Sequence, residues 1–117
     1  MTSAETLRAK FESELKRGSA MLAVLSNLRE PQYGYSLRQA LIEDGMPIEE
    51  GTLYPLLRRL EGQGILTSEW QVSDGPPRRY YRLSPAGSEL LADLTGAWGN
   101  LVATMEKILK DGSNGPA

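Results

Sequence analysis

The side chains best suited to chemistry lie close together in residues 51–61, where hydroxyl, aromatic and guanidinium groups interrupt a series of leucines. The leucines recur at intervals of three and four residues, the spacing that places them along one side of an α-helix. The other side would then present Thr52, Tyr54, Arg58 and Arg59. Such groups suit the phosphates and base edges of nucleic acid. An ordinary amphipathic helix with a solvated polar face would show the same pattern, so the interpretation depends on the rest of the chain.

The composition excludes most catalytic and metal chemistry. The 117 residues include no cysteine and no histidine, which removes disulfides, thiolate sites, Ser/His triads and most zinc sites. Glu49 and Glu50 directly precede residues 51–61, where negative charge stabilises the start of a helix. That role is favoured over a catalytic carboxylate pair. We therefore expect no enzyme activity, no cofactor and no metal site.

Size and charge narrow the class further. A chain of 117 residues, 40% hydrophobic, suits one small domain that gains from oligomerisation. No apolar run approaches the roughly 20 residues of a membrane span, and the N-terminus lacks a signal sequence, so we expect a cytoplasmic protein without a membrane partner. The net charge of −2 opposes non-specific nucleic-acid binding. Residues 51–82 nevertheless hold five Lys/Arg against three Asp/Glu, the one third of the chain with a positive excess.

Three helices are predicted before residue 51 from the spacing of apolar side chains. They cover residues 3–16, 21–28 and 36–43. Thr2 and Glu5 form a candidate capping box at the first of them. Lys16-Arg17-Gly18 predicts a bend or a helix junction, and Tyr33-Gly34-Tyr35 a short loop.

A fourth helix and a hairpin follow. Thr52 is expected to cap this helix, because an earlier start would place Pro55 too deep within it. Gly62 and Gly64 are expected to end it. Beyond them, β-branched and aromatic residues predict two strands joined by a tight turn. The strands cover residues 65–72 and 78–83, and the turn covers 73–77. The second strand alternates, with Tyr81 and Leu83 on one face and Arg78, Tyr80 and Arg82 on the other.

The C-terminal third predicts a long helix that begins at Ser84-Pro85, a cap followed by proline in the first turn. Its apolar residues alternate in steps of three and four, which is a heptad seam. The seam consists of Leu91, Leu94, Trp98, Leu101, Met105 and Ile108. A small domain needs less apolar surface than this, so we expect a homodimer, with Phe11 of the first helix in the same interface. The domain boundaries are then 1–84 for the N-terminal helix and DNA-binding part, 85–110 for the dimerisation helix and 111–117 for a disordered tail.

The order of these elements is that of a winged helix-turn-helix. The predicted fold class is α+β, mostly helical, with a three-helix core, a two-stranded wing, an N-terminal helix and a long C-terminal dimerisation helix. In this layout the third core helix enters the major groove and the wing lies along the backbone or minor groove. The basic residues occur at just these two places: Arg58, Arg59, Arg78, Arg79 and Arg82. Their placement favours sequence-specific DNA binding.

Several sequence blocks resemble the PadR family of bacterial transcriptional regulators, over roughly residues 15–110. They are Tyr33-Gly34-Tyr35, residues 51–61, Gly64-Ile65-Leu66, Trp70 and residues 77–87. The single C-terminal helix is similar to that of the compact branch of the family. The resemblance implies a homodimeric winged-helix repressor on a pseudo-palindromic operator. Such repressors usually control a nearby transport, efflux or detoxification gene and are often released by a small ligand.

The resemblance also implies roles for single residues. The positions similar to the family's DNA contacts are Tyr35, Ser36, Thr52, Tyr54 and Arg59 on the helices, and Arg78, Arg79 and Tyr80 on the wing. Arg58 and Arg82 join this set as further outward cations on the same two elements. Arginine can fork onto phosphate or guanine, whereas tyrosine and threonine hydroxyls mostly anchor the backbone.

Trp98 leaves two interpretations open. In the middle of a dimerisation helix it can be interface core. Alternatively, two-fold symmetry could place it and its mate on either side of a planar aromatic molecule, with Leu22 and Ala23 as further lining residues. Some compact PadR-like regulators bind aromatic drugs in this way, so the resemblance supports the second interpretation. The acidic composition leaves one alternative for the whole chain, a winged-helix protein-interaction or ligand-carrier module without DNA binding.

Overall fold

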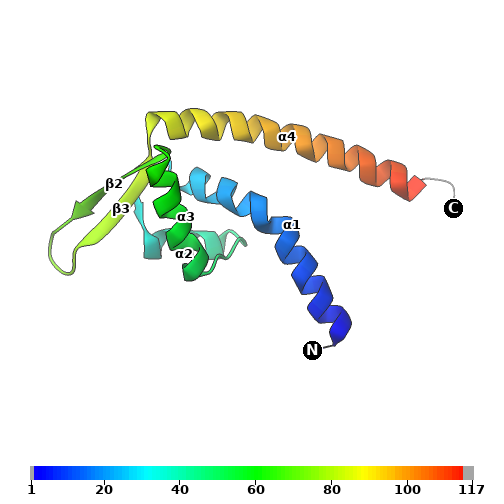
Figure 1. Cartoon of the computed structure of the whole chain (residues 1–117), viewed down its shortest axis with the longest axis horizontal. Helices are drawn as coiled ribbons and strands as arrows, with labels where there is room; N and C mark the ends of the chain where they lie inside the picture. Colours follow the sequence, from blue (N-terminus) through cyan, green and yellow to red (C-terminus); the bar gives the residue numbers. More distant parts are fainter. Residues whose placement is uncertain (1, 115–117) are drawn as a thin grey trace.

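The computed structural model describes the backbone of residues 2–114 and the side chains of residues 2–111. The described part folds into four helices and a three-stranded antiparallel sheet, which confirms the predicted α+β winged-helix class (Figure 1). The elements are α1 (Ser3–Asn27), β1 (Gln32–Tyr33), α2 (Gly34–Glu43), α3 (Glu50–Gly62), β2 (Leu66–Gln71), β3 (Arg78–Leu83) and α4 (Pro85–Asn114).

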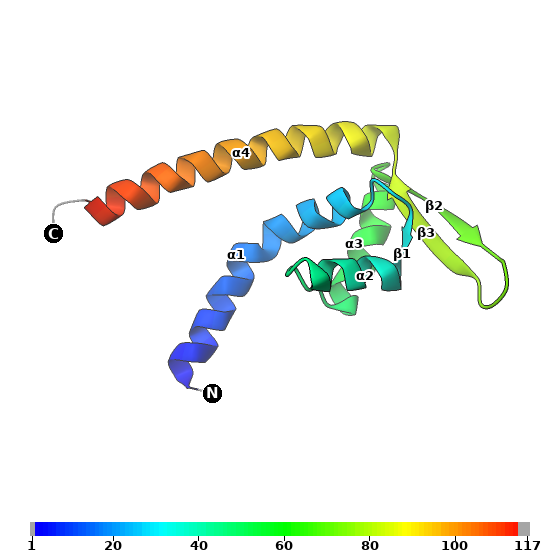
Figure 2. The ribbon, with the colours of Figure 1, turned by 180° about the vertical axis from the view of Figure 1, so that it is seen from behind.

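α1 is one helix where two were predicted. Its start has the predicted capping box, in which Thr2 and Glu5 bond each other's backbone amides at 3.1 Å. Figures 1 and 2 show that α1 changes direction part-way along its length, so the chain bends without a break. Gly18 is exposed, and a single glycine costs a helix only about 1 kcal/mol, which is too little to end a helix that is capped at Thr2 and packed on the core at Val24 and Leu25.

The prediction of a loop at residues 33–35 is wrong. Gln32 and Tyr33 form β1, which pairs with Tyr81 and Tyr80 of β3, and α2 begins directly at Gly34. The sheet therefore has the order β1-β3-β2, with one short strand beside the predicted wing. A strand of two residues has no periodicity of its own, so only its pairing with β3 defines it.

The prediction that Thr52 caps α3 is also wrong. The helix begins at Glu50 with Glu49 as its cap, and the amide of Leu53 donates to the carbonyl of Glu49 at 2.8 Å. Pro55 therefore lies inside the helix, where it has no amide to donate to the carbonyl of Gly51. Gly51 is exposed, so water can reach that carbonyl. The predicted end at Gly62 is confirmed, and Gly64 follows with a φ of +79°.

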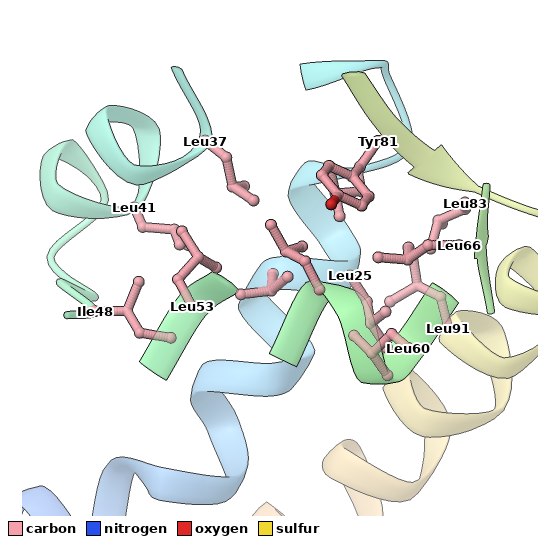
Figure 3. Packing of buried hydrophobic residues seen from close by; sticks show 13 residues of the cluster. Leu25, Leu37, Leu41, Ile48, Leu53, Leu60, Leu66, Tyr81, Leu83 and Leu91 are labelled. Carbon is pink, nitrogen blue, oxygen red and sulfur yellow. The ribbon is translucent and has the colours of Figure 1, made fainter. Parts of the chain in front are cut away.

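The core lies where α1, α2, α3 and the sheet meet (Figure 3). Three of the four leucines predicted to line the inner side of α3 occupy its centre, since Leu53 and Leu57 are fully buried and Leu60 nearly so. The fourth, Leu56, is partly buried beside it. Tyr81 and Leu83 reach the core from β3, as the alternation along that strand predicts. One side of α3 and one face of the wing pack against the core, so the opposite side of each remains exposed.

α4 begins at the predicted Ser84-Pro85, where the Ser84 hydroxyl accepts from the amide of Gly87 at 3.0 Å. It continues to Asn114, so residues 111–114 are helical and the predicted tail is wrong there; residues 115–117 lie outside the described residues. Figures 1 and 2 show the free halves of α1 and α4 pointing away from the wing. Within residues 2–114, no helix is long and apolar enough to cross a bilayer.

Candidate nucleic-acid interface

The exposed side of α3 carries two unpaired arginines. Arg58 and Arg59 are both exposed, and no ion pair among the described residues engages either of them. At 100° per residue they lie across the helix from Leu53 and Leu60. Thr52 is also exposed, one to two turns closer to the start of the helix. These three predicted residues are therefore available to a partner of α3.

Tyr54 does not face outward as predicted. Its side chain is half-buried and lies against Gly34 at the start of α2. A Cβ on Gly34 would be 2.5 Å from both Cε1 and Oη of Tyr54, far inside van der Waals contact. The ring thus packs α3 onto the first turn of α2. This contact joins residues twenty positions apart, so helical spacing within α3 could not predict it.

The first turn of α2 and the wing meet in an aromatic cluster. The Tyr33 ring is stacked against that of Tyr35, with centroids 6.2 Å apart, and is 5.4 Å from that of Tyr80. The guanidinium carbon of Arg78 lies 4.6 Å from the centroid of Tyr33, within cation–π distance. The Ser36 hydroxyl donates to the carbonyl of Tyr33 at 3.0 Å. The structure therefore brings four of the predicted residues together around Tyr33, namely Tyr35, Ser36, Arg78 and Tyr80.

Sequence reasoning missed Tyr33 as a site residue. It lies in the Tyr33-Gly34-Tyr35 block, but its role depends on the pairing of β1 with β3, which places it beside Tyr80. Tyr35 is 63% exposed at the edge of the cluster, whereas Tyr33 is half-buried beneath it. Tyr33 thus supports the exposed groups instead of presenting its own hydroxyl fully to solvent.

The wing presents its cations on opposite faces. Arg78, Tyr80 and Arg82 share the outer face of β3, and Arg78 and Arg82 are exposed. Arg79 is on the inner face with Tyr81, where it forms a 2.7 Å ion pair with Glu61 of α3. The structure therefore separates Arg79 from the other predicted wing contacts. The alternation along β3 itself places Arg79 on the face of Tyr81 and Leu83, opposite Arg78 and Arg82.

Two arginines outside the predicted set lie next to α3. Arg38 of α2 donates to the carbonyl of Ile48 at 2.9 Å and lies 3.5 Å from the carboxylate of Glu50. It thereby ties α2 to the segment before α3 and offsets an acidic group there. Arg17 of α1 lines, with Thr52 and Arg59, a groove of about 520 Å³ between α1 and α3. The local sequence of α1 does not indicate that Arg17 belongs to the candidate site, because only tertiary packing brings it beside α3.

A second groove, of about 280 Å³, lies between α1 and α4. Trp98 and Leu22 line it, together with Leu15, Met21 and Leu101, so the structure places two of the three predicted ligand residues in one apolar cavity. Ala23 is not among its lining residues and packs against the core instead. One residue further along α1 turns the side chain by about 100°, which accounts for the difference.

The predicted dimer seam divides into two parts. Leu91 is only 4% exposed and belongs to the core of the single chain, because the first turns of α4 pack on the sheet and α1. Leu94 is half-buried beside that core. Further along, Trp98 is 44%, Leu101 51%, Met105 40% and Ile108 53% exposed, and Phe11 of α1 is 60% exposed. About half of the surface of each of these side chains is left uncovered by the described chain.

Three comparisons with known proteins agree on one family. The model of the transcriptional regulator PadR-like family matches residues 21–93. The transcriptional regulator Rv3488 of Mycobacterium tuberculosis is 41% identical over 81 residues, which are 68% of this chain and 76% of that protein.

Two solved structures are similar over most of the chain. One is a PadR family transcriptional regulator from Eggerthella lenta, with 43% identity, a TM-score of 0.87 and coverage of 92% of this chain and 96% of the other. A PadR-like transcription factor from Bacteroides fragilis has 37% identity and a TM-score of 0.71, and the match covers 85% of this chain and 98% of that one.

Proposed function

Since the chain belongs to the PadR-like family of transcriptional regulators, we propose that it binds operator DNA as a homodimer, through α3, the start of α2 and the wing. Members of this family regulate transcription and are not enzymes. One observation carries the proposal for DNA: exposed arginines without ion-pair partners in the described chain lie on two separate elements, Arg58 and Arg59 on α3 and Arg82 on β3. An acidic protein that exposes unpaired cations in this arrangement is suited to phosphate.

In this proposal α3 lies in the major groove. Its exposed side carries guanidinium groups that can bind base edges or phosphates, and the flanks of a groove-bound helix face the two strands of the duplex. Tyr35, Ser36 and Arg78 would face one strand from the aromatic cluster. Arg59 and Arg17 would face the other strand from the groove between α1 and α3.

The uncovered apolar side chains support a homodimer. Trp98, Leu101, Met105 and Ile108 lie along one seam of α4, and monomers rarely expose contiguous apolar surface of this kind. A second copy of α4, with Phe11 at the edge, would cover it. Two-fold symmetry then places two copies of α3 on successive half-sites of a pseudo-palindromic operator.

The DNA proposal is tested by fluorescence anisotropy with labelled duplex from the region upstream of the protein's own gene. We expect tight binding at low salt and a large loss in the double variant Arg58→Ala/Arg59→Ala. Lys10→Ala is the matched control, since Lys10 is an exposed cation on α1, away from the wing. If the unaltered protein retained no duplex at low salt and formed a stable complex with another protein instead, the interaction-module alternative would replace the proposal.

We further propose that the protein is a repressor of a nearby transport or detoxification gene, released by a planar aromatic molecule. The support is the apolar groove between α1 and α4, which contains Trp98 and Leu22. Met21 lines this groove and also the groove beside Thr52 and Arg59. A ligand that moves α1 would therefore act on both sides of it.

Trp98 provides the assay for the ligand. Emission from a Trp70→Phe variant, in which Trp98 is the remaining tryptophan, is followed during titration with a panel of planar aromatic dyes. We expect a bound dye to quench Trp98 emission. We expect this quenching to disappear when Leu22→Arg is added to the Trp70→Phe variant, because the longer side chain fills the groove. Emission that stays unchanged across the panel, or equal quenching in both variants, would remove the ligand from the proposal and leave Trp98 as interface core.

A further inference from the structure

Arg79 joins the wing to the recognition helix through a closed ring of polar contacts. Its Nη2 donates to Oε1 of Glu61 at 2.7 Å, and its Nε donates to Oγ of Ser68 at 3.0 Å. The Ser68 hydroxyl donates in turn to Oε2 of Glu61. Glu61 is in the last turn of α3, Ser68 is on β2 and Arg79 is on β3, so one ring connects all three elements.

Two aromatic rings hold the same guanidinium group. Its central carbon lies 5.4 Å from the ring centroid of Tyr81 and 5.9 Å from that of Trp70. Trp70 is also the residue paired with Arg79 across the hairpin. The side chain is 37% exposed, and its partner Glu61 is 28% exposed. Arg79 is thus held by charge, hydrogen bonds and rings at once, unlike Arg82, which makes no such contact in the described chain.

The polar ring of Arg79, Ser68 and Glu61 lies where it can control the direction of the wing. Beyond Arg79 the hairpin consists of exposed residues only, from Gln71 through the turn to Arg78. A two-stranded hairpin is marginally stable without a partner. At its base the hairpin packs on the core through Leu66 and Leu83, so the ring is an outer second attachment to α3. The direction of the wing relative to α3 therefore depends on this ring, together with the contact of Arg78 with Tyr33 on the other face of the wing.

We propose that Arg79 is a positioning residue, which acts through Glu61 to set the angle between the wing and α3, and is not a phosphate contact. This inference rests on the proposed DNA binding. It explains why an acidic residue belongs on the recognition helix of a DNA-binding protein: Glu61 holds the wing instead of repelling the duplex.

The Glu61→Ala variant distinguishes the two possible roles of Arg79, because the two roles predict changes of opposite sign in operator affinity. If Arg79 contacts phosphate, Glu61→Ala removes a competing negative charge and releases the guanidinium group, so operator affinity rises. If Arg79 positions the wing, Glu61→Ala weakens binding by roughly fivefold, as Arg79→Ala does, and the double variant is no weaker than either single variant. Glu69→Ala is the matched control, an exposed acid on the outer face of the same hairpin, and it is not expected to weaken binding.

Operator affinity is measured by fluorescence anisotropy, with thermal unfolding to verify that each variant is folded. Amide hydrogen exchange of the free protein supplies a second readout. We expect faster exchange at residues 66–71 and 78–83 in both Glu61→Ala and Arg79→Ala, and not in Glu69→Ala. Tighter binding by Glu61→Ala, additive losses in the double variant, or unchanged exchange would overturn the inference. A protein that binds no operator but shows the expected exchange would refute DNA binding while retaining the attachment of the wing.

Discussion

The proposed contact of the wing with DNA phosphates can be tested through the salt dependence of binding. Arg78 is exposed next to the wing turn, and its guanidinium group is held over the Tyr33 ring at 4.6 Å. In the proposed symmetric dimer on a two-fold operator, each protomer would present one Arg78 to the duplex. Arg78→Ala therefore removes two contacts from the complex.

The expected change follows from counterion release. Each phosphate contact contributes about 0.9 to the slope of log K against log salt, so the loss of two lowers the slope by about 1.8. Between about 50 and 200 mM salt, a fourfold change, the ratio of wild-type to variant affinity should then shrink by about twelvefold. The defect of Arg78→Ala is thus large at low salt and small at high salt.

The assay is fluorescence anisotropy of one operator duplex at several salt concentrations, with Lys10→Ala as the control for a distant cation. Lys10→Ala should reproduce the wild-type slope. A slope for Arg78→Ala equal to that of the wild type would refute the phosphate contact, even if affinity fell. A slope reduced by about 0.9 would mean that only one Arg78 of the dimer reaches the backbone.

Three further predictions concern stability and assembly. Gly34→Ala should destabilise the fold by about 1–3 kcal/mol through overlap with Tyr54, and in a Tyr54→Ala background the same change should become neutral or stabilising; thermal or urea unfolding would show a persistent loss if the contact were misplaced. Leu57→Ala, at a fully buried position, should cost about 2–5 kcal/mol in urea unfolding, and a loss below about 1 kcal/mol would contradict its place in the core. Ile108→Asp should shift the protein toward monomer in sedimentation velocity while leaving helix content unchanged, because a charge would enter the apolar seam; an unchanged dimer would exclude this part of α4 from the interface.

Local patterns determined much of the fold. The period of the leucines in α3, the alternation along β3, the capping box at Thr2 and the cap at Ser84 depend on neighbours within a few residues, and the structure confirms each of them. Their physical causes are hydrogen bonds and side-chain faces that repeat every two to four residues. For the same reason the polar side of α3 could be identified, with Arg58 and Arg59 on its exposed side.

Only the tertiary structure decided which of the predicted site residues are available. Tyr54 packs on Gly34, Arg79 pairs with Glu61, and Leu91 joins the core, because each meets an element distant in sequence. Tyr33 enters the site through a strand too short to have a pattern. Side-chain period determines which way a residue points within its own element, whereas contacts between elements determine what it meets there.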